Sequence, residues 1–235
     1  MMVTTEHTSK QFDTELEWVR TRVLHMGGLV ENNIWQAIEA LTCNDATLMG
    51  RAITDDNRVN ELAVEIDEIC NQIIARRQPT AGDLRTVMTV IKTVNDLDRI
   101  GDEAKKITRM ARLLSVKHSL CLPRYKEISH AAKLVLGMLH RSLDAFARMD
   151  MSAAAQVVRQ DELVNAEFQN IMRYLVTFMM EDPRTISTAL EILFVAKAIE
   201  RIGDHAKNIS KYVVYMVNGR DVRHVSVEEI ERDMQ

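Results

Sequence analysis

The chain has 235 residues, a net charge of −4 and a pI near 6.0, with 46% hydrophobic, 27% charged and 5% aromatic residues. An acidic balance supplies no basic field for phosphate backbones, so nucleic acid is not an expected partner. No apolar stretch approaches the roughly 18 residues that a spanning helix requires. The N-terminus also lacks the apolar core of a signal peptide, so we expect a cytoplasmic protein.

Apolar residues recur at helical spacing along most of the chain, which predicts an all-α protein with six long helices. Thr80 with Asp83 resembles a capping box at the start of the third helix, and Asp182-Pro183 marks the start of the sixth. The three prolines and eight glycines are few for this length. The predicted helices span residues 12–42, 46–75, 81–114, 123–148, 152–180 and 182–217.

An internal duplication relates the two halves of the chain. Asp98-Arg-Ile-Gly-Asp102 and Glu200-Arg-Ile-Gly-Asp204 lie 102 residues apart (200 − 98) on the third and the sixth helix. Each half has the order long helix, turn, long helix, proline, motif helix, which is typical of a three-helix bundle. We therefore predict two tandem pseudo-symmetric bundles at 8–115 and 122–217, lying end to end or side by side, and a flexible tail at 218–235.

The two acids of each motif are four residues apart, so they lie one above the other on their helix and repel unless a cation joins them. The advance of 100° per residue places Asp98 and Glu200 within the apolar arc, and Asp102 and Asp204 about 40° nearer its edge. Carboxylates at the rim of a core need partners.

Two kinds of cation fit this pattern. Local ion pairs are one, and the lysines at suitable spacing are Lys105 and Lys106 for Asp102, Lys207 for Asp204, and Lys197 for Glu200. Such pairs give no reason for Gly101 and Gly203, each of which costs a helix about 1 kcal/mol relative to alanine. Close approach by another helix, or by ligands around an ion, does give one. Oxygen-rich surroundings suit Mg, Mn or Fe ions.

An acid-Arg-Ile-Gly-Asp motif on the third helix of each of two three-helix repeats resembles the PhoU family, and the resemblance covers nearly the whole chain. Other segments that resemble family segments are Arg76-Arg-Gln-Pro-Thr-Ala, Asp144-Ala-Phe-Ala-Arg-Met-Asp150 and Met180-Glu-Asp. The family comprises accessory regulators of phosphate-specific transport. The resemblance implies a cytoplasmic homodimer without known catalysis, which reaches the membrane only through its partners.

In this family picture the protein is a negative regulator of the phosphate-starvation response. It would act as an adaptor between the ATP-binding subunit of the phosphate ABC transporter and a phosphate-sensing histidine kinase. The family's metal motif, an acid followed four residues later by Asp, maps onto Asp98 with Asp102 and onto Glu200 with Asp204. Asn208 continues the second row by one turn.

The first copy departs from this pattern. Asp98 is one methylene shorter than glutamate, and Lys106 stands where the second copy has Asn208, so the second site is expected to bind a divalent or trivalent ion more readily. A metal is not strictly required. Four polar residues on the preceding helices are candidate additional ligands: Asp56, Asn60, Asp161 and Asn165. The alternative is that they are exposed polar residues with no ligand.

Two alternatives stay open. A carboxylate-bridged metalloenzyme would also place acids on facing helices, but such sites use a Glu-x-x-His pair, which this sequence lacks. A metal-free helical scaffold is the other.

Two regions are candidate partner-binding surfaces. Arg76, Arg77 and Arg85 form a basic cluster near the turn between the second and third helices. Phe146, Arg148 and Met149, at the end of the fourth helix, combine apolar residues with an arginine, a composition that interfaces favour.

Overall fold

The computed structural model describes residues 10–43, 46–116 and 125–232, without the side chains of 10, 46–56, 116 and 125. This part of the chain contains helices and no strand, which confirms the all-α prediction. No helix in it is long and apolar enough to cross a bilayer. The elements are α1 (Lys10–Cys43), α2 (Ala46–Arg77), α3 (Ala81–Val116), α4 (Tyr125–Arg148), α5 (Met151–Glu181), the 3-10 turn η1 (Pro183–Thr185), α6 (Ile186–Asn218) and α7 (Val227–Arg232).

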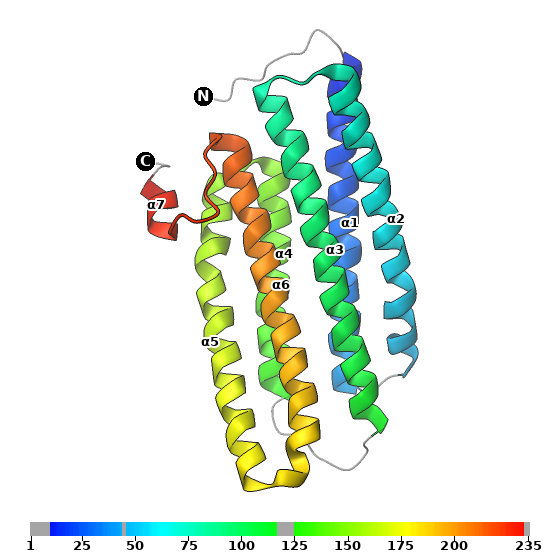
Figure 1. Cartoon of the computed structure of the whole chain (residues 1–235), viewed down its shortest axis with the longest axis vertical. Helices are drawn as coiled ribbons and strands as arrows, with labels where there is room; N and C mark the ends of the chain where they lie inside the picture. The colour runs from blue at the N-terminus through cyan, green and yellow to red at the C-terminus, as the bar shows by residue number, and fades with distance from the viewer. Residues whose placement is uncertain (1–9, 44–45, 117–124, 233–235) are drawn as a thin grey trace.

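The six long helices form two three-helix bundles that lie side by side (Figure 1). The first contains α1, α2 and α3, and the second α4, α5 and α6. α3 and α6 run antiparallel along the middle and pack against each other, and α1 also contacts α4. The motif helix of each repeat therefore lies at the boundary between the two bundles.

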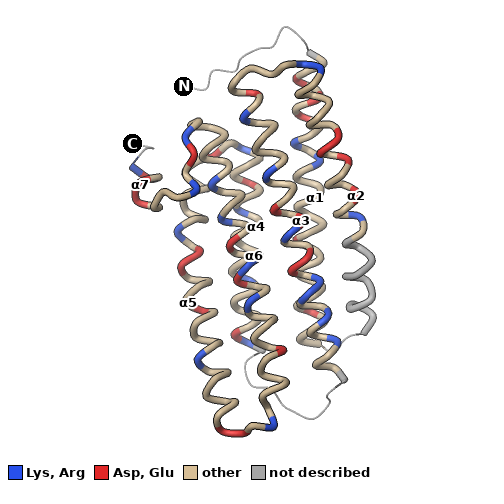
Figure 2. The backbone as a smooth tube through the Cα atoms, in the orientation of Figure 1, with Lys and Arg blue, Asp and Glu red and all other residues tan. Residues whose placement is uncertain are grey.

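Amphipathic periodicity explains this packing, because each helix turns an apolar stripe toward the core. Ile34, Ile66 and Ile100, from the three helices of the first bundle, are fully buried. Val135 and Ile199 are fully buried in the second. Charged residues of both signs are spread along the helices (Figure 2).

Turn residues set the helix ends close to the predicted positions. The Asp150 carboxylate accepts a hydrogen bond from Ala153 N (3.0 Å) and caps α5. Gly219 ends α6 with a left-handed φ of 78°, a conformation that favours glycine. At the start of α3, the two residues of the predicted capping box meet through their side chains, since the Thr80 hydroxyl donates to Asp83 Oδ2 (2.7 Å).

The C-terminal segment differs from the predicted flexible tail. Residues 227–232 form α7, which packs against α5, and Val222 and Ile230 are buried. Glu231 pairs with Arg159 of α5 (2.6 Å). The few apolar residues in this polar stretch are spaced so that they reach the core, and burying them orders the segment.

Gly203 lies where three helices come close. A β-carbon on this residue of α6 would be 3.3 Å from Val164 Cγ1 of α5 and 3.4 Å from Val135 Cγ1 of α4. Neighbouring helices thus approach the backbone at this position, which is one of the two reasons for a glycine that the sequence suggested.

This close approach predicts a difference between two helical glycines. A β-carbon added to Gly28 of α1 would meet no atom within 4 Å, so Gly28→Ala should raise the free energy of unfolding by up to about 1 kcal/mol. Gly203→Ala should raise the free energy of unfolding by less than Gly28→Ala, or lower it. Gly203→Leu should lower the free energy of unfolding by about 1–3 kcal/mol through overpacking. Urea unfolding of the three variants measures this, and equal gains for the two alanine variants would contradict it.

Candidate functional site

The two motif copies face a common groove between α3 and α6. It has a volume of about 360 Å³. The residues that line it are Arg99, Asp102, Glu103, Lys106, Arg201, Asp204 and His205. The duplicated sequence thus supplies an arginine and an aspartate from each repeat to one surface.

Ion pairs across this boundary join the two repeats. Glu103 of α3 is buried and accepts from Lys106 Nζ (2.6 Å) and from Arg201 of α6 (3.3 Å). His205 Nδ1 of α6 lies 2.5 Å from Asp96 Oδ1 of α3. These contacts were not predicted from the sequence. The feature that could have indicated them is the position of two acids, Asp96 and Glu103, within the apolar stripe of α3.

In the second repeat, lysines already hold two of the carboxylates. Lys197 Nζ donates to both oxygens of Glu200, at 2.7 and 2.6 Å. Asp161 of α5 is buried, and its Oδ2 accepts from Lys207 Nζ (2.6 Å) and from Asn165 Nδ2 (3.0 Å). The local pair predicted for Lys197 is present, whereas Lys207 reaches α5 rather than Asp204.

Asp204 lies beside these pairs without a direct partner in the described part of the chain. Partial burial raises the pKa of its carboxyl, and the charges of Glu200 and Asp161 raise it further. Lys207 and Lys197 offset this rise only in part. Asp204, Glu200 and Asp161 are therefore close enough to interact. Of these three carboxylates, Asp204 is the one that no lysine holds among the described residues. Asn208, one turn further along α6, is half-buried.

The first repeat lacks an equivalent cluster among its described residues. Asp102 is 3.5 Å from Lys105, while Lys106 turns to Glu103. Asp98 is half-buried, as its place in the apolar arc suggested, and Asn60 is exposed. The side chain of Asp56 lies outside the described residues.

The carboxylates do not form a ready-made metal site. No group of three or more His, Cys, Asp or Glu side chains converges on one point within the described residues. Lys197 and Lys207 occupy the oxygens of Glu200 and Asp161 that an ion would use. A metal ion at the second site would therefore have to displace at least one ammonium group.

The predicted arginine cluster does not form one basic surface. Arg77 makes a two-pronged pair with Glu15 of α1, at 3.0 and 2.6 Å, which lowers the pKa of that glutamate. The Arg85 guanidinium lies about 3.5 Å from the β-carbon position of Gly219 and so packs under the C-terminal segment. Arg76 alone is exposed.

The second predicted surface also changes. Phe146 is fully buried in the core, so the prediction that it contacts a partner is wrong; it lies on the inner side of α4. Arg148 is exposed and pairs with Asp144 one turn earlier. Met149 forms the turn to α5 with a φ of 52°. Arg20 of α1 donates to the carbonyl of Ala147 (2.6 Å) and fixes this turn against the first repeat.

The environment of Asp204 predicts a pH-dependent effect of its removal. With a native pKa above the unfolded value, the folded protein binds more protons between the two values, so stability falls as pH rises through that window. Asp204→Asn should therefore raise the free energy of unfolding at pH 7 and have no such effect below about pH 4. Urea unfolding at both pH values measures this. The control is Asp102→Asn, at the equivalent position of the first repeat beside Lys105. A destabilised Asp204→Asn at pH 7 would contradict the prediction.

Comparison with known proteins agrees with this architecture. The PhoU domain model matches the chain twice, at residues 23–111 and 128–213. The phosphate-specific transport system accessory protein PhoU of Edwardsiella tarda is 46% identical over 228 residues, which cover 97% of this chain and 93% of that protein.

Two solved structures have the same fold. The crystal structure of PhoU from Pseudomonas aeruginosa matches with a TM-score of 0.86 and 45% identity, over 89% of this chain and 100% of that one. The phosphate transport system regulatory protein PhoU from Streptococcus pneumoniae matches with a TM-score of 0.82 and 26% identity, over 90% and 99%. Because sequence and fold agree over nearly the full length, this chain belongs to the PhoU family.

Proposed function

We propose that this protein is a regulatory adaptor of phosphate transport. It restrains the phosphate-starvation response by linking the ATP-binding subunit of the phosphate ABC transporter to a phosphate-sensing histidine kinase, and it modulates uptake in the same complex. It acts in the cytoplasm as a homodimer, without catalysis, and reaches the membrane through its partners. The observation that carries the proposal is the whole-length similarity to accessory proteins of phosphate-specific transport.

The geometry of the two repeats supports an adaptor. Polar groups at the α3–α6 boundary pair with one another: Glu103 pairs with Lys106 and Arg201, and Asp96 pairs with His205. These contacts fix the repeats relative to each other, so that surfaces on both are presented at a constant spacing. A rigid spacing is what a protein needs when it holds two partners in one complex.

Deletion of the gene tests the regulatory role. In the deletion strain, we expect phosphate-starvation genes to be expressed constitutively in phosphate-rich medium. In cells that contain the protein, we expect it to co-purify with both the ATP-binding subunit and the kinase. Reintroduction of the wild-type gene should restore repression. A gene that carries Gly28→Ala, which changes an exposed position of α1, should restore repression equally. A normal phosphate response after deletion would refute the adaptor.

We also propose that a divalent or trivalent ion, when it binds, uses Glu200, Asp204 and Asp161 of the second repeat. The argument rests on the place of Asp204 beside Glu200 and Asp161; burial raises the pKa of its carboxyl most, and the two neighbouring carboxylates raise it further. A bound Mg, Mn or Fe ion would supply positive charge there and draw α5 and α6 together. The ammonium groups of Lys197 and Lys207 compete with it, so affinity depends on the lysines as much as on the acids.

Removal of one lysine tests this competition. Lys197→Met frees both oxygens of Glu200, so Mn²⁺ should bind roughly tenfold more tightly than to the wild type, and Asp204→Asn should abolish the gain. Isothermal titration calorimetry with Mn²⁺ measures this. The control is Lys105→Met, which frees Asp102 of the first repeat; equal gains from the two lysine variants would contradict the preference for the second site.

A further inference from the structure

We propose that the outward face of α4, formed by Lys126, Ser129, His130 and Lys133, docks an acidic segment of a partner protein. We call this face the α4 basic stripe. The proposal rests on the adaptor function given above and names one surface through which it would act. None of the partner-binding residues predicted from the sequence belongs to it.

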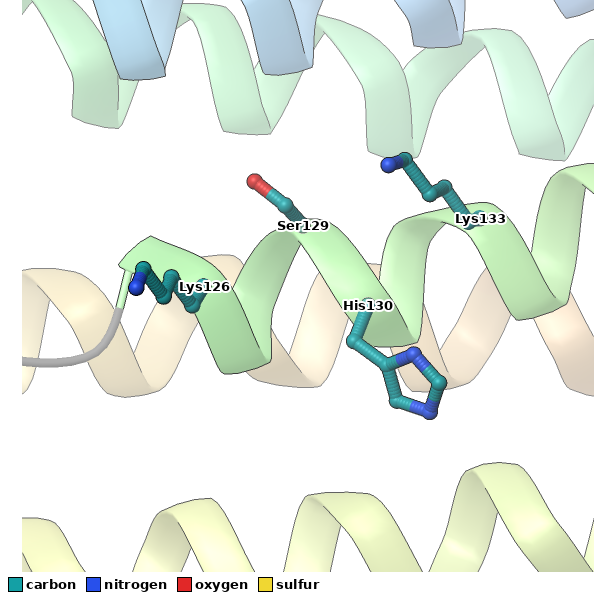
Figure 3. A pocket seen from close by; sticks show the side chains of 4 residues that line it. All are labelled: Lys126, Ser129, His130 and Lys133. Atoms are coloured by element: carbon teal, nitrogen blue, oxygen red, sulfur yellow. The ribbon is translucent and has the colours of Figure 1, made fainter.

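The spacing of these residues places them on one side of the helix. Positions i, i+3, i+4 and i+7 follow one face of an α-helix over two turns. Figure 3 shows Ser129 and Lys133 leaning to one side of this face, His130 to the other, and Lys126 at the start of the helix. Together they line a hollow of about 370 Å³. The stripe is therefore an open and shallow basic surface.

The basic side chains of the stripe lack partners within the described part of the chain. Within the described residues, Lys126, His130 and Lys133 make no hydrogen bond or ion pair, and all three are exposed. This contrasts with Lys106, Lys197 and Lys207, which all neutralise carboxylates of their own chain. The two lysine ammonium groups of the stripe therefore keep donors that an acidic ligand could use.

The surroundings of the stripe favour a narrow acidic ligand. Lys126 and Lys133 are seven residues apart, or about 10 Å along the helix, which spans two turns of a helix or three to four residues of an extended chain. Glu127 and Glu167 line the next hollow, between α4 and α5, with Arg173. A flat anionic membrane or a nucleic acid would meet these carboxylates as well, whereas a short acidic segment can contact the stripe alone. The Ser129 hydroxyl adds a donor for a carboxylate.

The first test uses full-length protein and a labelled helical peptide of about twelve residues with glutamate on one face. The variant is Lys126→Glu with Lys133→Glu. The control is Arg109→Glu with Arg112→Glu, which changes two exposed arginines of α3 and alters the net charge equally. Fluorescence anisotropy at low and high salt gives the affinities, and circular dichroism checks that both variants are folded. The same peptide with glutamine in place of glutamate, and phosphatidylglycerol-containing vesicles, are the other probes.

We expect the wild type and the control to bind the glutamate peptide, more weakly at high salt, and the stripe variant to bind at least about tenfold more weakly. Equal peptide binding by the stripe variant and the control would overturn the proposal. Loss of vesicle binding in the stripe variant, without peptide binding by the wild type, would overturn it in favour of a membrane surface.

The second test measures binding of the purified ATP-binding subunit and the cytosolic part of the kinase. The stripe variant should lose at least about tenfold in affinity for one of them, while the control stays within about twofold. If both bind the two variants equally, the docking site is wrong although the adaptor function stands. If neither binds the wild type, the adaptor function fails, and the peptide measurement alone decides whether the stripe recognises acidic segments.

Discussion

Three buried carboxylates govern how the helices of this protein fit together. The side chains of Asp96, Glu103 and Asp161 are 6%, 6% and 4% exposed. A buried carboxylate without a hydrogen-bonding or charged partner costs several kcal/mol, so each must meet one. In all three cases α6 provides one, in the pairs Asp96–His205, Glu103–Arg201 and Asp161–Lys207. Sliding α6 by one turn would separate all three pairs, which fixes its register against both α3 and α5.

The same constraint explains how the two motif copies have diverged. Arg201 of the second copy pairs with Glu103 of the first, and pseudo-symmetry would pair Arg99 with residue 205. Residue 205 is histidine, and it pairs with Asp96 instead. Arg99 is left without an ion pair among the described residues. The duplication therefore preserves the helices and the direction of the motif, while the polar contacts at the boundary differ between the repeats.

Sequence reasoning reached the features that depend on one helix at a time. Prolines and capping residues set the helix ends, so the predicted spans lie close to the observed ones. The 100° advance placed Glu200 correctly toward the inside, where its side chain is 12% exposed. Gly203 has the close neighbours that its helical cost suggested.

The contacts that depend on which helix lies opposite a side chain were not predicted from the sequence. Lys207 is correctly spaced for Asp204 yet bonds to Asp161, because α5 lies within its reach. Phe146 stands beside the exposed Arg148 in sequence but turns into the core. Periodicity gives the direction of a side chain from its own helix and does not identify the neighbour it meets. The order of the C-terminal segment was missed for the same reason, since its few apolar residues gain their partners only from the folded bundle.

The central position of α6 bears on how a regulator of this kind could respond to a ligand. Of the long helices described, α6 is the one that packs against α3, α4 and α5 together. It carries Asp204, which no lysine holds among the described residues. It also carries the partners of the buried carboxylates of Asp96, Glu103 and Asp161. A cation that moved α6 would strain contacts in both repeats at once, whereas a ligand on the outer face of α4 would touch none of these pairs. Any communication between the proposed ion site and the proposed docking surface would therefore pass through the packing of α4 on α5 and α6 rather than through a shared set of side chains.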